Sequence, residues 1–507
     1  MTSLDHKGPG LFVAIKWSYA ANISTAAMRV FLLMFLARVL EPEDFGTYGI
    51  LLAVLGFSGL LLGLGLNQAV IQRPDLKPEH VTLALVIVGV GGTVGGLVIA
   101  LGATPLARLF GTPEIAPVLA FGSPILVLNL LSAIGFGLVR RFMDFRWLTI
   151  FGLITLIGVF APIAVILALN GAGVWSLVIA MGAQSVASLV AIVLRWRNFD
   201  LKAPARLRDS AELLKYGSKT AVYNGLNSAE NLILSFTILN TLGLTELGIY
   251  NRASRLRELA QEQLGMSAVG AIFSHFARVH GRSGDLSLEF RGSLALVSSV
   301  MIPLFFGASA SSDVIVTVVL GEKFVAAANL LTWLFLTVPM IINQSIASNV
   351  VVATGRVWPF IRTQVIFLGV FASAIALMPK VNLESLVILW ASLVSLRLLI
   401  FNAIAMRATG LGLRSFLALH FLGVWAAGFV CGALLVSKCL FVFLSPIFLL
   451  PLLVVVGALA LGLGFLIAPA ALYEPYLVQA AFRLTKKERL APLRRLLILK
   501  FGSDAGV

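Results

Sequence analysis

The chain has 507 residues, of which 59% are hydrophobic and 12% charged, with a mean hydropathy of +0.98 and a formal net charge of +15. Soluble globular domains carry about 25% charged residues, so this composition excludes a soluble protein and indicates a helical bundle in lipid. The sequence shows no alternating strands of an outer-membrane barrel, and its two cysteines do not imply a disulfide framework.

Apolar segments that can cross the ~30 Å hydrocarbon core of a bilayer follow one another along the chain. The eighth is the least apolar because it contains NRASRLRELAQEQLG (251–265), whose polar face can line a cavity instead of meeting lipid. We predict fourteen spanning helices, near 11–39, 46–69, 81–104, 116–139, 148–169, 174–194, 213–240, 247–276, 293–320, 329–353, 360–378, 383–406, 415–437 and 440–468.

Lysine and arginine are concentrated in alternate loops between these spans. Loops on one side, together with Lys7 and the tail from Arg483 to Lys500, hold 26 basic residues, and loops on the opposite side hold 5. Because basic residues mark cytoplasmic loops, we predict that both termini are cytoplasmic. The same bias accounts for most of the net charge, so a basic pI requires no nucleic-acid partner.

Two spans 202 residues apart carry the same ladder of polar side chains at spacings of +4, +3 and +4, which places each set on one helix face. The same offset relates Phe45-Gly46-Thr47-Tyr48 to Leu247-Gly248-Ile249-Tyr250. A polar stripe repeated in two hydrocarbon-length helices indicates a cavity between two related halves, as in a secondary transporter. The predicted cavity-lining residues are Ser18, Asn22, Thr25 and Arg29 in the first helix, and Thr220, Asn224, Asn227 and Asn231 in the seventh.

The repeat extends beyond the stripe, since Leu109-Phe110-Gly111 matches Val319-Leu320-Gly321 at an offset of 210. We therefore predict an all-α polytopic membrane protein in which two pseudo-symmetric six-helix lobes surround a central cavity and two further helices follow. The predicted parts are an N-terminal lobe at 1–200, a C-terminal lobe at 201–410, helices thirteen and fourteen at 411–469, and a basic cytoplasmic tail at 470–507.

Seven basic residues lie within the predicted spans, where a central charge costs about 2.5–3.5 kcal/mol even on lenient insertion scales. Arg29 ends the first polar stripe, and Arg252 and Arg255 stand at the corresponding end of the eighth helix. We interpret these three as cargo-binding residues, with a purely structural role as the alternative. They make the interior cationic on balance, which suits a diphosphate that arginine binds in a bidentate manner.

Glu230 lies beside the second polar stripe, and Lys219 is eleven residues earlier on nearly the same helix face. A buried carboxylate in a membrane helix can bind a coupling proton or sodium ion. The alternative is a structural ion pair with Lys219 or with an arginine of the eighth helix. In that helix Glu258 and Glu262 can each pair with a basic neighbour one turn away.

The sequence has no G-x-x-x-x-G-K-[ST] loop, no H-E-x-x-H and no cluster of cysteine and histidine. We therefore expect no ATP hydrolysis, no metal site and no cofactor, and the short loops predict a protein that is not an enzyme. The glycine pairs Gly91/Gly95 and Gly92/Gly96 predict close helix packing.

Four segments resemble the Wzx-like polysaccharide transporters of the multidrug/oligosaccharidyl-lipid/polysaccharide (MOP) superfamily, in particular the branch similar to colanic acid exporters. They are LARVLEPEDFGTYGI (36–50), GLGLNQAVIQRPDL (63–76), LGIYNRASRL (247–256) and ATGR (353–356), within a resemblance that covers about residues 10–470. It implies alternating access that flips undecaprenyl-diphosphate-linked oligosaccharides from the cytoplasmic to the periplasmic leaflet of a bacterial inner membrane, for exopolysaccharide or O-antigen synthesis.

The cationic cavity of that family corresponds by position to Arg29, Arg252 and Arg255, whereas no coupling-ion site can be matched residue by residue. The resemblance also implies a polymerase and a chain-length regulator of the same pathway as partners, and H+ or Na+ as the coupling ion. Three alternatives remain. A lipid-II-type flippase would carry a similar headgroup. A multidrug exporter would require a buried carboxylate in the first lobe, where none is placed. A membrane polymerase or transferase would require a grouped catalytic set, but His275, His280 and His420 are scattered.

Overall fold

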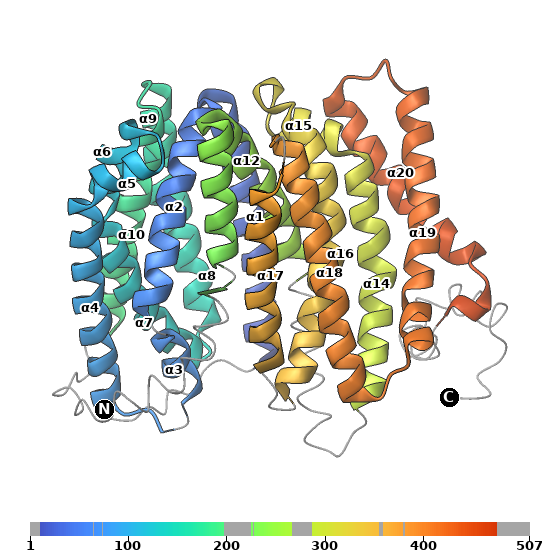
Figure 1. Ribbon diagram of the computed structural model, residues 1–507, viewed down its shortest axis with the longest axis horizontal. Coiled ribbons are helices and arrows are strands. Elements are labelled where there is room, and N and C mark those ends of the chain that lie inside the picture. Colours follow the sequence, from blue (N-terminus) through green and yellow to red (C-terminus); the bar gives the residue numbers. More distant parts are fainter. Residues whose placement is uncertain are drawn as a thin grey trace. The chain divides into compact units, whose positions relative to one another are not determined.

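A computed structural model of the chain describes residues 11–63, 65–73, 75–196, 225–226, 228–265, 286–353, 358–378 and 381–473. Within these ranges the regular secondary structure is helical throughout (Figure 1). The chain forms two compact units. The first comprises Met1–Arg252, Val319–Phe324 and Gln364–Leu383; the second comprises Ala253–Val318, Val325–Thr363 and Glu384–Val507. The lobe boundaries at residues 200 and 410 stay predictions.

The helices up to residue 260 begin with a long α1 and are interrupted by one π-helical segment, η2. They are α1 (Leu11–Val39), α2 (Pro42–Gly63), α3 (Leu66–Gln72), α4 (Pro78–Leu101), α5 (Ala103–Leu109), η1 (Pro113–Ile115), α6 (Ala116–Gly122), α7 (Pro124–Arg141), α8 (Phe145–Leu153), η2 (Ile154–Phe160), α9 (Ala161–Leu169), α10 (Val174–Trp196), helical residues 228–242 and α12 (Leu244–Ala260).

The remaining elements include five of the longest helices. They are η3 (Gln261–Gly265), α14 (Leu286–Ala310), α15 (Ser312–Val319), η4 (Glu322–Phe324), α16 (Ala327–Ala353), α17 (Trp358–Ala376), α18 (Leu383–Thr409), α19 (Leu413–Leu440), α20 (Pro446–Ile467) and η5 (Ala470–Leu472).

Eleven helical segments of the described residues are long and apolar enough to cross a membrane, and each overlaps one of the fourteen predicted spans. They are Pro42–Gly63, Pro78–Leu101, Pro113–Arg141, Arg146–Leu169, Val174–Trp196, Phe290–Ala310, Ala327–Ser348, Trp358–Ala376, Leu383–Thr409, Leu413–Leu440 and Pro446–Ile467. The predicted multi-pass helical architecture is thereby confirmed. The first predicted span has the bounds of α1, which is helical but is not among these eleven segments. The seventh lies partly outside the described residues. In the eighth, α12 ends at Ala260 and passes into the π-helical η3, and residues 266–285 lie outside the described residues.

Helix boundaries follow from proline and glycine. Proline begins α2, α4, α7 and α20, where its missing N–H leaves no helical hydrogen bond unmade. The glycines of the matched tripeptides, Gly111 after α5 and Gly321 after α15, both have positive φ, 68° and 84°. This left-handed conformation suits glycine because it has no β-carbon. The tripeptide match therefore marks the same turn in both halves of the sequence.

In the first unit, α4 packs on α7 through the predicted glycines. A β-carbon on Gly92 would lie 3.1 Å from the α-carbon of Val127, and one on Gly96 would lie 3.2 Å from the carbonyl oxygen of Ser123. The end of α3 is held by Arg141 of α7, whose Nη1 donates to the carbonyls of Val70 (3.2 Å), Ile71 (3.2 Å) and Arg73 (2.7 Å). These carbonyls have no partner inside the short helix, so Arg141 supplies the missing donors.

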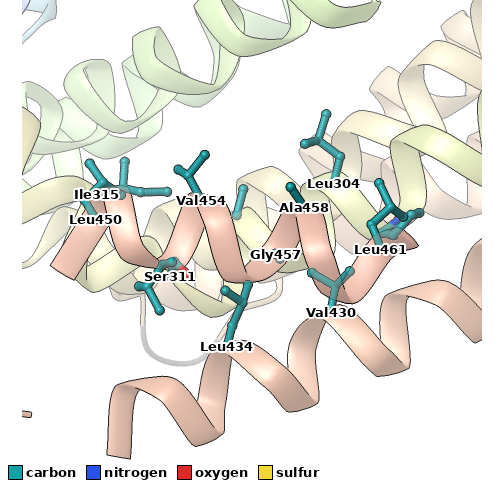
Figure 2. Close-up of a pocket in the computed structure, with 14 residues that line it drawn as sticks. Leu304, Ser311, Ile315, Val430, Leu434, Leu450, Val454, Gly457, Ala458 and Leu461 are labelled. Atoms are coloured by element: carbon teal, nitrogen blue, oxygen red, sulfur yellow. The ribbon is translucent and has the colours of Figure 1, made fainter. Parts of the chain in front are cut away.

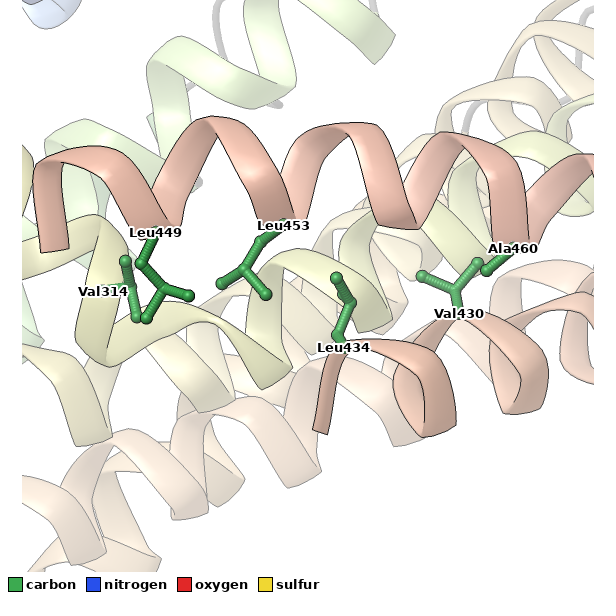
Figure 3. Close-up of a cluster of buried hydrophobic side chains, with 6 residues drawn as sticks. All are labelled: Val314, Val430, Leu434, Leu449, Leu453 and Ala460. Atoms are coloured by element: carbon green, nitrogen blue, oxygen red, sulfur yellow. The ribbon is translucent and has the colours of Figure 1, made fainter. Parts of the chain in front are cut away.

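In the second unit, α14 lies between α16 and α19, and α19 and α20 form an antiparallel pair (Figure 1). The close approach of α14 and α19 depends on Gly423, because a β-carbon there would overlap the carbonyl oxygen of Ser298. Side chains of α15, α19 and α20 fill the space beside this contact (Figure 3): Val314, Val430, Leu434, Leu449, Leu453 and Ala460.

Candidate transport site

The N-terminal turns of α2 and α12 cross at two glycines of the sequence repeat. A β-carbon on Gly46 would overlap the carbonyl oxygen of Leu244, and one on Gly248 would overlap the carbonyl oxygen of Pro42. Leu244 and Gly248 stand 202 residues after Pro42 and Gly46, so each contact becomes the other when the two helices are exchanged. An approximate two-fold axis produces this reciprocity. The repeat seen in the sequence is therefore present in the packing.

Polar side chains cross the same axis. Thr245 Oγ1 donates a hydrogen bond of 2.9 Å to Glu43 Oε1, and these two residues are also 202 positions apart. Asn251 Nδ2 donates to the carbonyl of Phe45 at 3.3 Å. The two repeats thus meet through backbone contacts at glycine and through hydrogen bonds.

Only part of each predicted polar stripe lies within the residues that the structure describes. Thr25 is half-buried and Arg29 is exposed on α1, and Asn231 is exposed on the helix of residues 228–242. Ser18 and Asn22 belong to α1, but their side chains lie outside the described residues. The remaining predicted positions also lie outside the described residues: Lys219, Thr220, Asn224 and Asn227.

The two predicted cargo-binding arginines of α12 have defined partners. The guanidinium of Arg252 lies over the ring of Phe45, 4.0 Å from its centroid, in a cation–π arrangement. Arg255 Nη1 lies 3.1 Å from Glu258 Oε2, which confirms the pairing predicted for Glu258. The same atom lies 3.8 Å from Glu262 Oε1, so this partner of Glu262 is two turns away and not one turn away as predicted. Both ion pairs are partly exposed, so each contributes only about 0–1 kcal/mol. A doubly charged anion can therefore compete with these carboxylates for Arg255.

Arg257 differs from its neighbours because its side chain is buried. Its Nη2 lies 3.6 Å from Glu258 Oε1, and its guanidinium lies 5.3 Å from the ring centroid of Trp390 on α18. The sequence assigned a cargo-binding role to Arg255 and no role to Arg257. The spacing provides the signal, since positions two apart point about 200° away from each other on a helix. Arg257 therefore fastens α12 to α18, while Arg255 faces elsewhere.

Among the residues that the structure describes, Glu230 is the one buried acidic side chain, with 5% of its surface exposed. The fully buried Gln364 of α17 donates from Nε2 to Glu230 Oε2 at 3.1 Å. Sequence reasoning missed Gln364, although a glutamine inside the apolar run of α17 is a signal in itself. A carboxylate that receives an amide donor in a buried site can hold a proton or a desolvated cation.

A separate apolar pocket lies in the second unit (Figure 2) and has a volume of about 300 Å³. Its one polar side chain, Ser311, carries no charge, so the pocket cannot neutralise a diphosphate and suits hydrocarbon instead. It is lined by Pro303, Leu304, Gly307 and Ala308 of α14, by Ser311 and Ile315, by Val430 and Leu434 of α19, and by Leu450, Leu453, Val454, Gly457, Ala458 and Leu461 of α20.

Solved structures of transporters have the same fold. The lipid II flippase MurJ in an inward closed conformation superposes with a TM-score of 0.69 at 14% identity, over 89% of this chain and 98% of that one. An inward-facing multidrug resistance MATE family transporter of the MOP superfamily superposes with a TM-score of 0.57 at 14% identity, over 78% of this chain and 98% of that one. The protein is therefore a multi-pass helical membrane protein that shares the fold of these transporters.

Sequence comparison gives the family. Residues 35–329 match the family described as polysaccharide biosynthesis protein, and the chain belongs to that family. The succinoglycan biosynthesis transport protein ExoT of Rhizobium meliloti (strain 1021) is 27% identical over 322 residues, 62% of this chain. The lipopolysaccharide biosynthesis protein WzxC of Escherichia coli (strain K12) is 21% identical over 319 residues, 61% of this chain.

The matched stretches span 63% of the length of each of these two relatives. The predicted resemblance to Wzx-like transporters is confirmed. The expectation of a transporter, not an enzyme, agrees with the names of these relatives.

Proposed function

We propose that this protein flips a lipid-linked oligosaccharide from the cytoplasmic to the periplasmic leaflet of a bacterial inner membrane by alternating access. The observation that carries the proposal is the family match over residues 35–329. The fold, which is similar to that of a lipid II flippase, supports it. The excess of basic residues in alternate loops supports cytoplasmic termini. The direction is the one that the resemblance to Wzx-like transporters implies.

The positive charge of three arginines supports an anionic cargo. Arg29, Arg252 and Arg255 lie within the predicted first and eighth spans, and binding an anion would offset the cost of placing these charges in a membrane. An undecaprenyl diphosphate offers two phosphates that fit the guanidinium fork. While no cargo is bound, the carboxylates of Glu258 and Glu262 neutralise and orient the guanidinium of Arg255.

Energy is proposed to come from an ion gradient, since the sequence has no nucleotide-binding loop. Glu230 is the proposed H+ or Na+ site, supported by its burial and by the hydrogen bond from Gln364. A polymerase and a chain-length regulator of the same pathway are the proposed partners, because an exported repeat unit must be consumed on the far side.

The test uses purified protein in liposomes that contain undecaprenyl-diphosphate-linked oligosaccharide, with transfer between leaflets measured by enzymatic access to the sugar. Arg29→Ala, Arg252→Ala and Arg255→Ala should each reduce transfer at least tenfold, while Arg255→Lys retains part of it because charge remains without the fork. Arg195→Ala is the matched control, since Arg195 pairs with Asp144 at 3.2 Å, away from these three arginines in the sequence.

Lipid II and a cationic drug serve as competing cargoes in the same liposomes. Preference for lipid II would favour a lipid-II-type flippase, and transport of the drug alone would favour a multidrug exporter. Normal transfer by all three alanine variants would contradict the cationic cavity.

A further inference from the structure

His420 lies inside α19, where it joins a hydrogen-bonded triad with Ser298 of α14 and Asn343 of α16. Asn343 Nδ2 lies 3.3 Å from His420 Nε2 and 3.3 Å from Ser298 Oγ, and His420 Nδ1 lies 2.9 Å from the carbonyl of Phe416. Ser298 is fully buried, Asn343 is 3% exposed and His420 is half-buried. Of the two histidines within the described residues, His80 lies in the first turn of α4, whereas His420 lies in the interior of α19.

The partners determine the tautomer of the neutral ring. A carbonyl oxygen only accepts, so Nδ1 carries the proton and donates to Phe416. Nε2 then accepts from Asn343 Nδ2, which also donates to Ser298 Oγ. The ring nitrogen able to take up a proton is thus already directed at a side-chain amide.

The carbonyl oxygen of the same amide, Asn343 Oδ1, provides the second observation. Asn343 Oδ1 is buried and has no hydrogen-bond partner among the residues that the structure describes. If Nε2 is protonated, rotation of the amide by half a turn brings Oδ1 to Nε2–H, and Ser298 can donate its hydroxyl proton to the same oxygen. All three residues keep their positions. Before the rotation Nδ2 donates to both His420 and Ser298, and after it Oδ1 accepts from both. The triad therefore offers partners to both forms of the ring.

Charged groups on the surrounding helices stand apart from the triad. No charged residue lies on α16, α20 or η5, and those on α14 and α19 are at least six residues away along their helices, about 9 Å at 1.5 Å per residue. The short η3, which packs on α16, carries Glu262. The titratable and charged residues on these packed helices are Glu289 and Arg291 on α14, and Arg414, Cys431, Lys438 and Cys439 on α19. Lys438 is paired with Asp313 at 2.7 Å.

We propose that the Ser298–Asn343–His420 triad is a reversible proton-binding site and that its occupancy couples proton movement to transport. The proposed coupling to transport rests on the proposed function, whereas the proposed proton binding does not. The location supports coupling, because protonation acts where Gly423 brings α19 against the backbone of α14 at Ser298. This site is separate from Glu230, which lies in the other compact unit.

The first experiment measures the ring directly. Protein labelled with 15N-histidine in lipid nanodiscs is titrated from pH 8.5 to pH 5, and the resonance of His420 is assigned by its loss in His420→Gln. We expect Nε2 to change from an acceptor to a protonated nitrogen within this range. A ring that keeps one protonation state throughout would overturn the proposal, whatever the cargo is.

The second experiment measures coupling in liposomes with undecaprenyl-diphosphate-linked oligosaccharide under an imposed pH gradient. One proton per cycle allows up to about a tenfold change in cargo distribution for each pH unit. His420→Gln, which keeps a donor amide, and Asn343→Leu, which removes Oδ1, should both reduce this ratio to one. His80→Gln is the matched control and should keep the ratio of the unmodified protein. A full gradient response in His420→Gln would refute coupling through the triad, while absence of transfer by the unmodified protein would refute the proposed function and leave the titration to decide the site.

Discussion

Replacing Gly46 by alanine tests whether the crossing of α2 and α12 depends on the missing β-carbons. The new β-carbon would overlap the carbonyl oxygen of Leu244 and would lie 3.1 Å from the carbon of that carbonyl. Both are backbone atoms, so no flexible side chain can turn away, and the helices must shift.

The magnitude follows from two opposed terms. Overpacking a tight contact costs about 1–3 kcal/mol. Alanine regains about 0.5–1 kcal/mol relative to glycine inside a helix. The net expectation is a destabilisation of about 0–2.5 kcal/mol, and relative to a glycine-to-alanine change that meets no neighbour it is about 1–3 kcal/mol, enough to change the ratio of folded to unfolded protein several-fold.

The assay is thermal unfolding of the purified protein in detergent, followed by the loss of monodisperse material. Gly56→Ala is the control on the same helix, because a β-carbon at Gly56 meets no atom within 4 Å. We expect Gly46→Ala to lower the midpoint and Gly56→Ala to leave it unchanged or raise it slightly. Equal midpoints for the two variants would refute the argument from the crossing.

Three further outcomes are expected. A reporter fused after Val507 should be active only in its cytoplasmic form, because 26 of the loop and tail basic residues share that side with both termini; periplasmic activity would reverse the topology. Glu230→Gln should remove the ion dependence of transport while the protein stays folded, as measured by transfer with and without a sodium or proton gradient; unchanged dependence would make Glu230 structural. Arg141→Ala should destabilise the protein by about 1–3 kcal/mol, since the carbonyls of Val70 and Arg73 lose a charged donor, and an unchanged unfolding midpoint would contradict this.

Hydrophobicity and charge alone determined the class of this protein and the extent of most of its helices. A span must be apolar over about 20 residues wherever it lies in the bundle, so composition marks it without knowledge of its neighbours. The repeat was visible for a similar reason, because Gly46 and Gly248 occupy equivalent turns and each accepts only a residue without a β-carbon.

Tertiary structure decided the partners. Gln364 and Glu230 are 134 positions apart, and Asn343 and His420 are 77 apart, so no local spacing relates them. In an apolar helix a single glutamine or histidine gives a strong signal that a partner exists, because a polar group in hydrocarbon must be satisfied. Which helix supplies the partner depends on packing, and packing is set by side-chain shape along whole helices. Sequence therefore indicated where polar chemistry lies, and only the fold determined which groups meet there.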